Sequence, residues 1–492
     1  MESFMPKKYI KLEKLARKGF HVSIPVVDQV TWRRFVTQDP SIPQTFARLR
    51  DYKLLLLDPN RRKTPRTVRV FPSIGSIRSL YEECGEAAWQ RLFRGLSNPA
   101  LTSSQRAIIE ADIDADLPTF DHNTETTHFI LRWTDSSANS ADNITDSSII
   151  TETGNFLETA WGKYNTAFAR APYVPAGGTK IEVVFYDIGG YYGVASPPDG
   201  PIQLSSNSWV ATPAIRRPVS AHELFHKLQY AFGFRTSWDP PAKYKYYSEG
   251  LCSWAEVFVW QCLSGKSKLT DMFTNPNLNL YDASYNALPF WVFFDARQKS
   301  SPTDNPILHY LTTCEPTGDL KAALDQVIGE EWPPNNVYSK LGNFYALFAR
   351  GRRIGDWRTG PVGTLYPNIL APDGTAIAPA LAVTNVPIGL SDTYSVSDLV
   401  SQLGSRYYRF AFEPDANGKT FSFSVNGTSG GDFAFYLIWE KGNAWKRATF
   451  PPNGLTNYSY SETVNLTEAD TLVLSISGHD SSGTYNLSAS IT

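Results

Sequence analysis

Cysteine is scarce in this 492-residue chain, and four cysteines are too few for the dense disulfide framework that stabilises small secreted domains. Cys252 and Cys262 stand ten residues apart in a stretch with helical periodicity. A helix rises about 15 Å over that spacing, which is beyond the reach of a disulfide. We therefore expect most of the thiols to be buried and free.

Long apolar runs are also absent, and none approaches the roughly 18 residues that a transmembrane helix needs. We predict no membrane span. The first 20 residues carry charges but no apolar core, so they do not resemble a signal peptide. Hydrophobic residues still make up 42% of the chain, which is enough for buried cores in about three domains.

Charge is unevenly distributed, although the whole chain carries a net charge of only -2. Residues 1–70 contain 16 Lys/Arg and 6 Asp/Glu, a balance of +10, so the remainder sums to -12. Such a basic segment either binds an anionic partner or docks on the acidic body as a prosegment or subdomain. No nucleic-acid-binding motif accompanies it. We therefore favour docking and predict no nucleic-acid partner.

The pattern of apolar residues changes three times along the chain and predicts an α+β protein. A mixed segment over residues 1–120 is interpreted as a basic prosegment or covering domain. Strands and amphipathic helices alternate through residues 121–363, and a linker rich in Pro, Ala and Gly spans 364–403. Short alternating strands over 404–492 predict an accessory β-sandwich.

Five Asn-x-Ser/Thr sequences are present, and four of them fall in the predicted sandwich. They matter only in a glycosylating host, and strands rich in Ser and Thr generate them readily by chance. The five asparagines are Asn143, Asn426, Asn457, Asn465 and Asn486.

The sequence His222-Glu223-Leu224-Phe225-His226 is the feature that points most directly to chemistry. Pro218 near the start and Gly233 near the end predict a helix around it. Histidines at positions i and i+4 share one helix face, about 6 Å apart along the axis, so both imidazoles can reach one zinc ion. Glu223 then stands where it can activate a water molecule bound by the metal. The alternative is a histidine pair on an ordinary helix.

A catalytic zinc site needs a third protein ligand and leaves its fourth position to water. Glu249 stands twenty-three residues after His226, at the start of a predicted helix over about residues 249–263, and is the preferred third ligand. Glu256 lies two turns later on the same face and is predicted to support a histidine ligand. The alternative for Glu249 is an acidic residue that the helix dipole favours at a helix start.

A hydroxyl group near the metal would stabilise the oxyanion that forms on a peptide carbonyl. Tyr285 is our candidate, with Tyr246 and Tyr247 as rivals and a packing role as the alternative. Cys84 is a weaker candidate for capping the zinc ion from the N-terminal segment, because thiolates bind zinc well.

The segment HELFH, followed by SEGL and a second glutamate, resembles the gluzincin zinc metallopeptidases. The sequences HKLQYAFGF and SYNALPFWVFF are closest to bacterial hyicolysin-like peptidases. The resemblance covers about residues 126–353 and implies a zincin-like catalytic domain, with Glu249 as ligand and Glu256 as its supporting acid. It also implies that Ile202–Ser205 is the edge strand that holds an extended substrate.

The Gly-x-Met-Glu-Asn segment with which aminopeptidases grip a free N-terminus is missing, so the resemblance favours an endopeptidase. RYYRFAF and GTYNLSAS in the C-terminal region resemble bacterial pre-peptidase C-terminal β-sandwich domains. These resemblances favour an extracellular location, although no signal peptide is visible in the sequence.

We predict hydrolysis of peptide or protein substrates with one Zn²⁺ per chain and Glu223 as the general base on the zinc-bound water. Two alternatives remain: a catalytically silent zinc-containing binding or adhesion protein, and a zinc hydrolase that acts on a non-peptide bond. The intact Glu223 argues against the first, because a purely structural zinc site does not need it. The sequence does not indicate an oligomeric state.

Overall fold

The computed structural model confirms a mixed α+β architecture. The described part of the chain contains nine α-helices, α6 to α14, and three sheets of four or five strands. The predicted N-terminal segment 1–120 lies almost wholly outside it, as does Cys84. The described residues are 118–188, 191–195, 198–234, 244–298, 304–331, 340–360, 363–429, 431–442, 444–450, 455–479 and 481–492.

Two compact units divide this part of the chain, and the division passes through two helices, α6 (Ser148–Phe168) and α8 (Arg216–Ala231). Residues 118–162 and 173–227 belong to the first unit. Residues 163–172 and the described residues from 228 onward belong to the second.

The first unit is built on a five-stranded sheet of order β1-β2-β3-β5-β4. The central strands β2, β3 and β5 are parallel, and β1 and β4 run antiparallel at the two edges. Helix α6 makes the crossover from β2 to β3, as parallel neighbours require. The strands are β1 (His122–Glu125), β2 (Phe129–Trp133), β3 (Ile181–Tyr186), β4 (Gly193–Ala195) and β5 (Ile202–Ser205).

The prediction that Ile202–Ser205 forms the edge strand is wrong. This strand, β5, lies between β3 and β4 and pairs with both of them. The edge belongs instead to β4 (Gly193–Ala195), which has only three residues and is too short to show an alternating pattern in the sequence.

The helical part of the second unit has a core of aromatic side chains. Phe290 of α11 lies against Phe344, Tyr345 and Phe348 of α14, with ring centroids 5.9 to 6.2 Å apart. Such edge-to-face and offset contacts are favourable arrangements for aromatic rings. The helices are α9 (Lys245–Trp260), α10 (Ser267–Thr274), α11 (Leu288–Gln298), α12 (Pro306–Thr317), α13 (Leu320–Glu331) and α14 (Leu341–Ile354).

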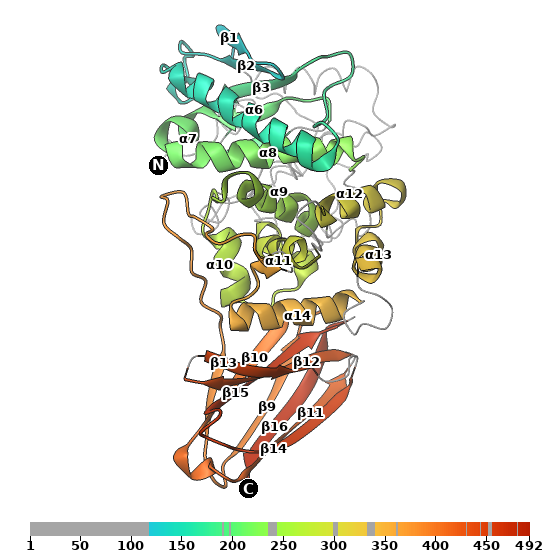
Figure 1. Ribbon diagram of the computed structural model, residues 1–492. Coiled ribbons are helices and arrows are strands. Elements are labelled where there is room, and N and C mark those ends of the chain that lie inside the picture. The colour runs from blue at the N-terminus through green and yellow to red at the C-terminus, as the bar shows by residue number, and fades with distance from the viewer. Residues whose placement is uncertain are drawn as a thin grey trace, which may run out of the picture. The chain divides into compact units, whose positions relative to one another are not determined.

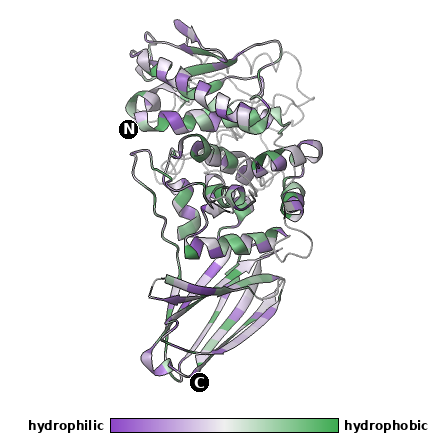
Figure 2. Cartoon of the chain, viewed as in Figure 1, coloured by the Kyte–Doolittle hydropathy of each residue, from purple (hydrophilic) through white to green (hydrophobic). Residues whose placement is uncertain are grey.

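The C-terminal region is a β-sandwich of two sheets, with orders β13-β12-β15-β10-β8 and β14-β11-β16-β9. Apolar and polar residues alternate along many of its strands (Figure 2), and the apolar ones form the core between the sheets. The strands are β8 (Thr384–Ile388), β9 (Thr393–Val400), β10 (Ser405–Phe412), β11 (Thr420–Ser429), β12 (Phe433–Lys441), β13 (Ala444–Thr449), β14 (Asn457–Thr463), β15 (Thr471–Gly478) and β16 (Gly483–Ile491).

The sandwich begins earlier than the sequence pattern indicates. Strands β8 and β9 are members of its two sheets, yet both lie within residues 364–403, which we predicted to be a linker. A proline at position 387 and the polar residues of β9 conceal them, since β8 and β9 are edge strands with exposed residues.

Helix α14 packs on the outer face of the first sandwich sheet (Figure 1). Ala349 contacts Tyr407, Ile438 and Val473, and the Tyr407 hydroxyl donates a hydrogen bond to the Ala349 carbonyl at 2.8 Å. The sandwich is thus joined to the helices by a small apolar cluster. Among the described residues, no helix is long and apolar enough to cross a membrane.

Candidate metal centre

Helix α8 carries the HExxH sequence, and all three of its polar side chains are buried. The exposed fraction is 2% for His222, 2% for Glu223 and 0% for His226. The two imidazole rings lie on one face of the helix with centroids 5.1 Å apart. A buried histidine pair at this spacing fits two nitrogen ligands of a single ion.

The neighbouring face of α8 lies against the edge strand β4. A Cβ atom at Gly193 would fall 2.7 Å from both Cγ and Oε1 of Glu223, so the Glu223 carboxylate touches the strand backbone. Only glycine permits this approach. Glu223 is therefore held beside the strand edge, while the two histidines point from an adjacent face.

The C-terminal half of α8 holds α9 through Gln229. The Gln229 amide donates hydrogen bonds to the carbonyls of Tyr247 and Ser248 at 3.1 and 3.2 Å, and the Cys252 thiol donates to its oxygen at 3.6 Å. Gln229 stands seven residues after His222 and three after His226, so it shares their helix face. This face of α8 is therefore the one that meets the first turns of α9.

Within the described part of the chain, His222, His226 and Cys252 form a group that could hold a metal ion. One nitrogen or sulfur atom from each lies within 4.8 Å of the others, and all three residues are buried. Two imidazoles together with a thiolate form a donor set that suits zinc. The residues present therefore fit the ion that the motif implies.

Cys252 was not among the ligands predicted from the sequence. We expected buried free thiols, and Cys252, Cys262 and Cys314 are indeed free of disulfides. The sequence feature that could have predicted Cys252 as a ligand is its position. Cys252 follows Glu249 by three residues, which is nearly one helical turn and places both on one face.

Glu249 lies in the second turn of α9, because this helix begins at Lys245 and not at Glu249 as predicted. It is buried, with an exposed fraction of 3%. Gly250 allows Ala287 and Trp291 to approach, since a Cβ there would fall 2.8 Å from each. The position of Glu249 away from the first turn weakens the alternative that the helix dipole alone accounts for it.

Glu256 is fully buried at the other end of α9 and accepts three hydrogen bonds. Ser264 donates its backbone N–H at 2.8 Å and its hydroxyl at 3.2 Å, and the Lys268 ammonium donates at 2.5 Å. The ammonium also lies 4.9 Å from the centroid of the half-buried Tyr285 ring. Glu256 and Tyr285 thus share one lysine. Their predicted roles at the metal remain predictions.

The rival hydroxyl groups, those of Tyr246 and Tyr247, are fully buried in α9. Burial raises the pKa of both well above the usual value, with smaller contributions from neighbouring groups, including Tyr281 for Tyr246 and Cys314 for Tyr247. Burial therefore favours the protonated hydroxyl at both positions, the form that can donate a hydrogen bond.

No protein-family model matches the chain, and no curated protein matches its sequence. Among solved structures, an aminopeptidase A from Legionella pneumophila in complex with aspartic acid shares 12% identity with a TM-score of 0.25, over 70% of this chain and 36% of the other. The pre-peptidase C-terminal domain of a collagenase from Bacillus anthracis shares 19% identity with a TM-score of 0.16, over 23% and 97%.

A periplasmic inhibitor of g-type lysozyme from Aeromonas hydrophila shows a similar degree of likeness. It shares 9% identity with a TM-score of 0.16, over 23% of this chain and all of the inhibitor chain. At these TM-scores the likenesses assign no family. Evidence for function therefore comes from the side chains of α8, β4 and α9.

Proposed function

We propose that the protein is a zinc-dependent endopeptidase. The observation that carries the proposal is the arrangement on α8: two buried histidines on one face, with the Glu223 carboxylate beside the edge strand β4 on the next. A structural zinc site needs the histidines but has no use for a carboxylate at this position. Peptide hydrolysis needs the two histidines to hold zinc and the carboxylate to take a proton from the attacking water.

His222 and His226 would hold the ion together with Glu249, and Cys252 is the rival third ligand. When bound, zinc polarises the peptide carbonyl and makes a water molecule acidic enough to attack it near neutral pH. Glu223 removes the proton from the attacking water and delivers it to the leaving amine. Tyr285 is the proposed donor to the oxygen of the tetrahedral intermediate.

The grouping of Cys252 with the two histidines supports a second candidate function. If Glu249 and Cys252 both joined the two histidines, the site would have four protein ligands and no position for water. Such a closed site would be structural, in a binding or adhesion protein. The two functions differ in catalysis but not in zinc content.

The deciding experiment uses the full-length chain on unfolded casein and on a mixed peptide library, with and without a chelator. We expect about one zinc per chain and cleavage that the chelator abolishes. Glu223→Gln should keep the zinc and lose turnover by about 10²-fold or more, because proton transfer is lost.

Glu182→Gln is a matched control, since Glu182 is half-exposed in the same unit and pairs with Arg132. It should retain full activity. A fully active Glu223→Gln variant would contradict the assignment of the general base. A zinc-replete wild-type protein that cleaves neither substrate would favour the closed structural site.

A further inference from the structure

Lys227, which directly follows the second histidine, is a fully buried lysine. Its ammonium donates hydrogen bonds to the carbonyls of Pro198 and Gly200, at 3.1 and 2.5 Å. Both carbonyls belong to the segment that leads from β4 to β5. An ammonium group is costly to bury unless hydrogen-bonded, so these contacts are strongly maintained.

Lys227 and Glu223 are four residues apart and share one face of α8. The Glu223 carboxylate lies against Gly193, the first residue of β4, and the Lys227 ammonium holds the chain just beyond the end of the same strand. Helix α8 therefore contacts the first residue of β4 through Glu223, and through Lys227 it binds the segment that follows β4.

Strand β4 is a short strand at the edge of its sheet. It has three residues and pairs with β5 alone among the described strands, with Gly193 opposite Leu204 and Ala195 opposite Ile202. A short strand paired on one side can shift unless its ends are anchored. Lys227 supplies an anchor from the helix that also carries the proposed general base.

We propose that Lys227 is a positioning residue that fixes β4 over α8 and so sets the place of the Glu223 carboxylate beside the strand. Gly193 is the complementary element, because it admits the carboxylate at this distance. The anchoring follows from the contacts alone. Its effect on turnover rests on the proposed peptidase function.

The test replaces Lys227 in the full-length protein with methionine, an unbranched side chain that is one atom shorter and carries no charge. Hydrogen exchange measured by mass spectrometry reports on residues 191–205, and it does so whether or not the protein is an enzyme. We expect exchange there to rise by about tenfold, because the β4–β5 pairing opens more often.

Zinc content should stay at about one per chain, because no ligand is altered. We expect kcat on a casein peptide to fall by about tenfold or more with little change in KM, since a misplaced base affects the reaction step more than binding. Lys227→Arg keeps the charge and should recover part of both losses.

Lys180→Met is the matched control. Lys180 also donates to a backbone carbonyl in the same unit, that of Thr126 at 2.7 Å, but this carbonyl lies in the turn before β2. Exchange over residues 191–205 and kcat should match the wild type.

Gly193→Ala tests the same contact from the strand and stays informative if Lys227→Met fails to fold. The added methyl group would meet Glu223 at 2.7 Å, so we expect kcat to fall by about tenfold with zinc retained. Gly162→Ala is its control, because a Cβ at Gly162 meets no atom within 4 Å.

If hydrogen exchange over residues 191–205 is the same in Lys227→Met as in the wild type, Lys227 does not anchor β4. Raised exchange with unchanged kcat would overturn the positioning role, as would a fully active Gly193→Ala variant. If the wild type cleaves no peptide, the proposed function fails separately, and the exchange measurement still decides the anchoring.

Discussion

At the scale of single residues, the open choice is the third ligand of the proposed metal site. Glu249 and Cys252 lie three residues apart on α9, about 4.5 Å along the axis and on one face. Glu256 is about 10.5 Å beyond Glu249, and Ser264 and Lys268 hold its carboxylate there. The choice therefore lies between Glu249 and Cys252.

We favour Glu249, because the Cys252 thiol donates a hydrogen bond to Gln229, a role that requires the protonated sulfur. Glu249→Ala should then remove zinc outright, whereas Cys252→Ser should keep zinc and activity. Glu256→Ala should weaken zinc affinity or rate by about 10–100-fold, as losses of supporting groups do. Metal analysis and casein cleavage of the three variants check this.

The opposite pattern of zinc content among these variants would also identify the ligand. A zinc-free Cys252→Ser protein beside a zinc-replete Glu249→Ala protein would make the thiolate the third ligand. A zinc-free Glu256→Ala protein beside a zinc-replete Glu249→Ala protein would move that role to Glu256.

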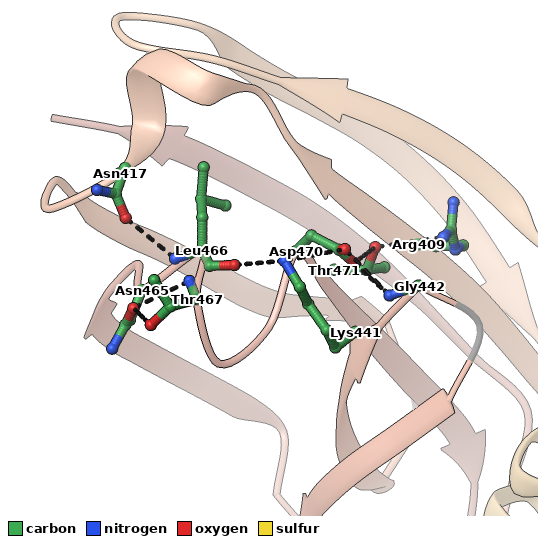
Figure 3. Close-up of polar contacts among 9 residues, drawn as sticks. All are labelled: Arg409, Asn417, Lys441, Gly442, Asn465, Leu466, Thr467, Asp470 and Thr471. Atoms are coloured by element: carbon green, nitrogen blue, oxygen red, sulfur yellow. Dashed lines mark hydrogen bonds and ion pairs between the residues drawn. The ribbon is translucent and has the colours of Figure 1, made fainter.

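At the scale of the elements, Asp470 fastens the turn after β12 to the loop before β15 (Figure 3). Its carboxylate accepts the Gly442 N–H at 3.0 Å, and the Lys441 ammonium, 3.6 Å away, also donates to the Leu466 carbonyl. Partial burial alone would raise the pKa of Asp470. The hydrogen bonds from Gly442 and Thr471 and the charge of Lys441 outweigh it and lower the pKa.

This lowered pKa predicts a pH dependence. A carboxyl group whose folded pKa lies below its unfolded value of 3.8 stabilises the fold above pH 3.8, and this contribution is lost as the pH falls through the folded pKa. Asp470→Asn should therefore increase hydrogen exchange in β12 and β13 at pH 5 to 6, and the difference from the wild type should shrink toward pH 3. A difference that stays constant with pH would contradict the assignment.

The elements that carry the proposed site were predictable to different degrees. The helix around His222 and the strand β3 follow from apolar periodicity, since both are long enough to show it. Strand β4 was not predictable, because three residues carry no pattern. The Lys227 contact was hidden for another reason: backbone carbonyls give no sign in a sequence that they will accept a buried ammonium.

The Asn-x-Ser/Thr sequences illustrate a regularity that only the sheet explains. Asn426 pairs with Asn457 on one side and with Asn486 on the other, so three of the five asparagines form one row across neighbouring strands. Side chains on one face of a strand recur every second residue, which is also the spacing of Asn and Ser/Thr in this motif. An exposed face of Asn, Ser and Thr therefore generates the motif without any glycosylation.

At the scale of the whole molecule, the sandwich is tied to the helical part of its unit by polar as well as apolar contacts. The buried Glu440 carboxylate of β12 accepts from Arg353 of α14 at 2.5 Å, with Arg409 of β10 at 3.7 Å. The Ser405 N–H donates to the Pro276 carbonyl at 2.8 Å. A Cβ at Gly342, in α14, would collide with the His479 ring of the sandwich.

These contacts predict that the sandwich is not dispensable for stability, although it supplies none of the proposed metal ligands. Truncation after Gln402 would remove the β-strands that cover Ala349 and leave β8 and β9 without partners. We expect a protein that is largely insoluble or melts well below the wild type, because an apolar helix face becomes exposed. Solubility and thermal unfolding of the purified chain measure this.

Truncation after Ala380 distinguishes loss of the α14 contact from the presence of unpaired strands as the cause of instability. It also removes β8 and β9 and so leaves none of the described strands unpaired. If only unpaired strands matter, this shorter chain should be as stable as the wild type. If the docking on α14 matters, it should be destabilised too. Glu440→Gln should then lower stability by about 2 kcal/mol in the intact chain, since two arginines lose their charged partner. A soluble, zinc-loaded and fully active chain ending at Ala380, with a wild-type melting temperature, would instead make the sandwich a detachable accessory.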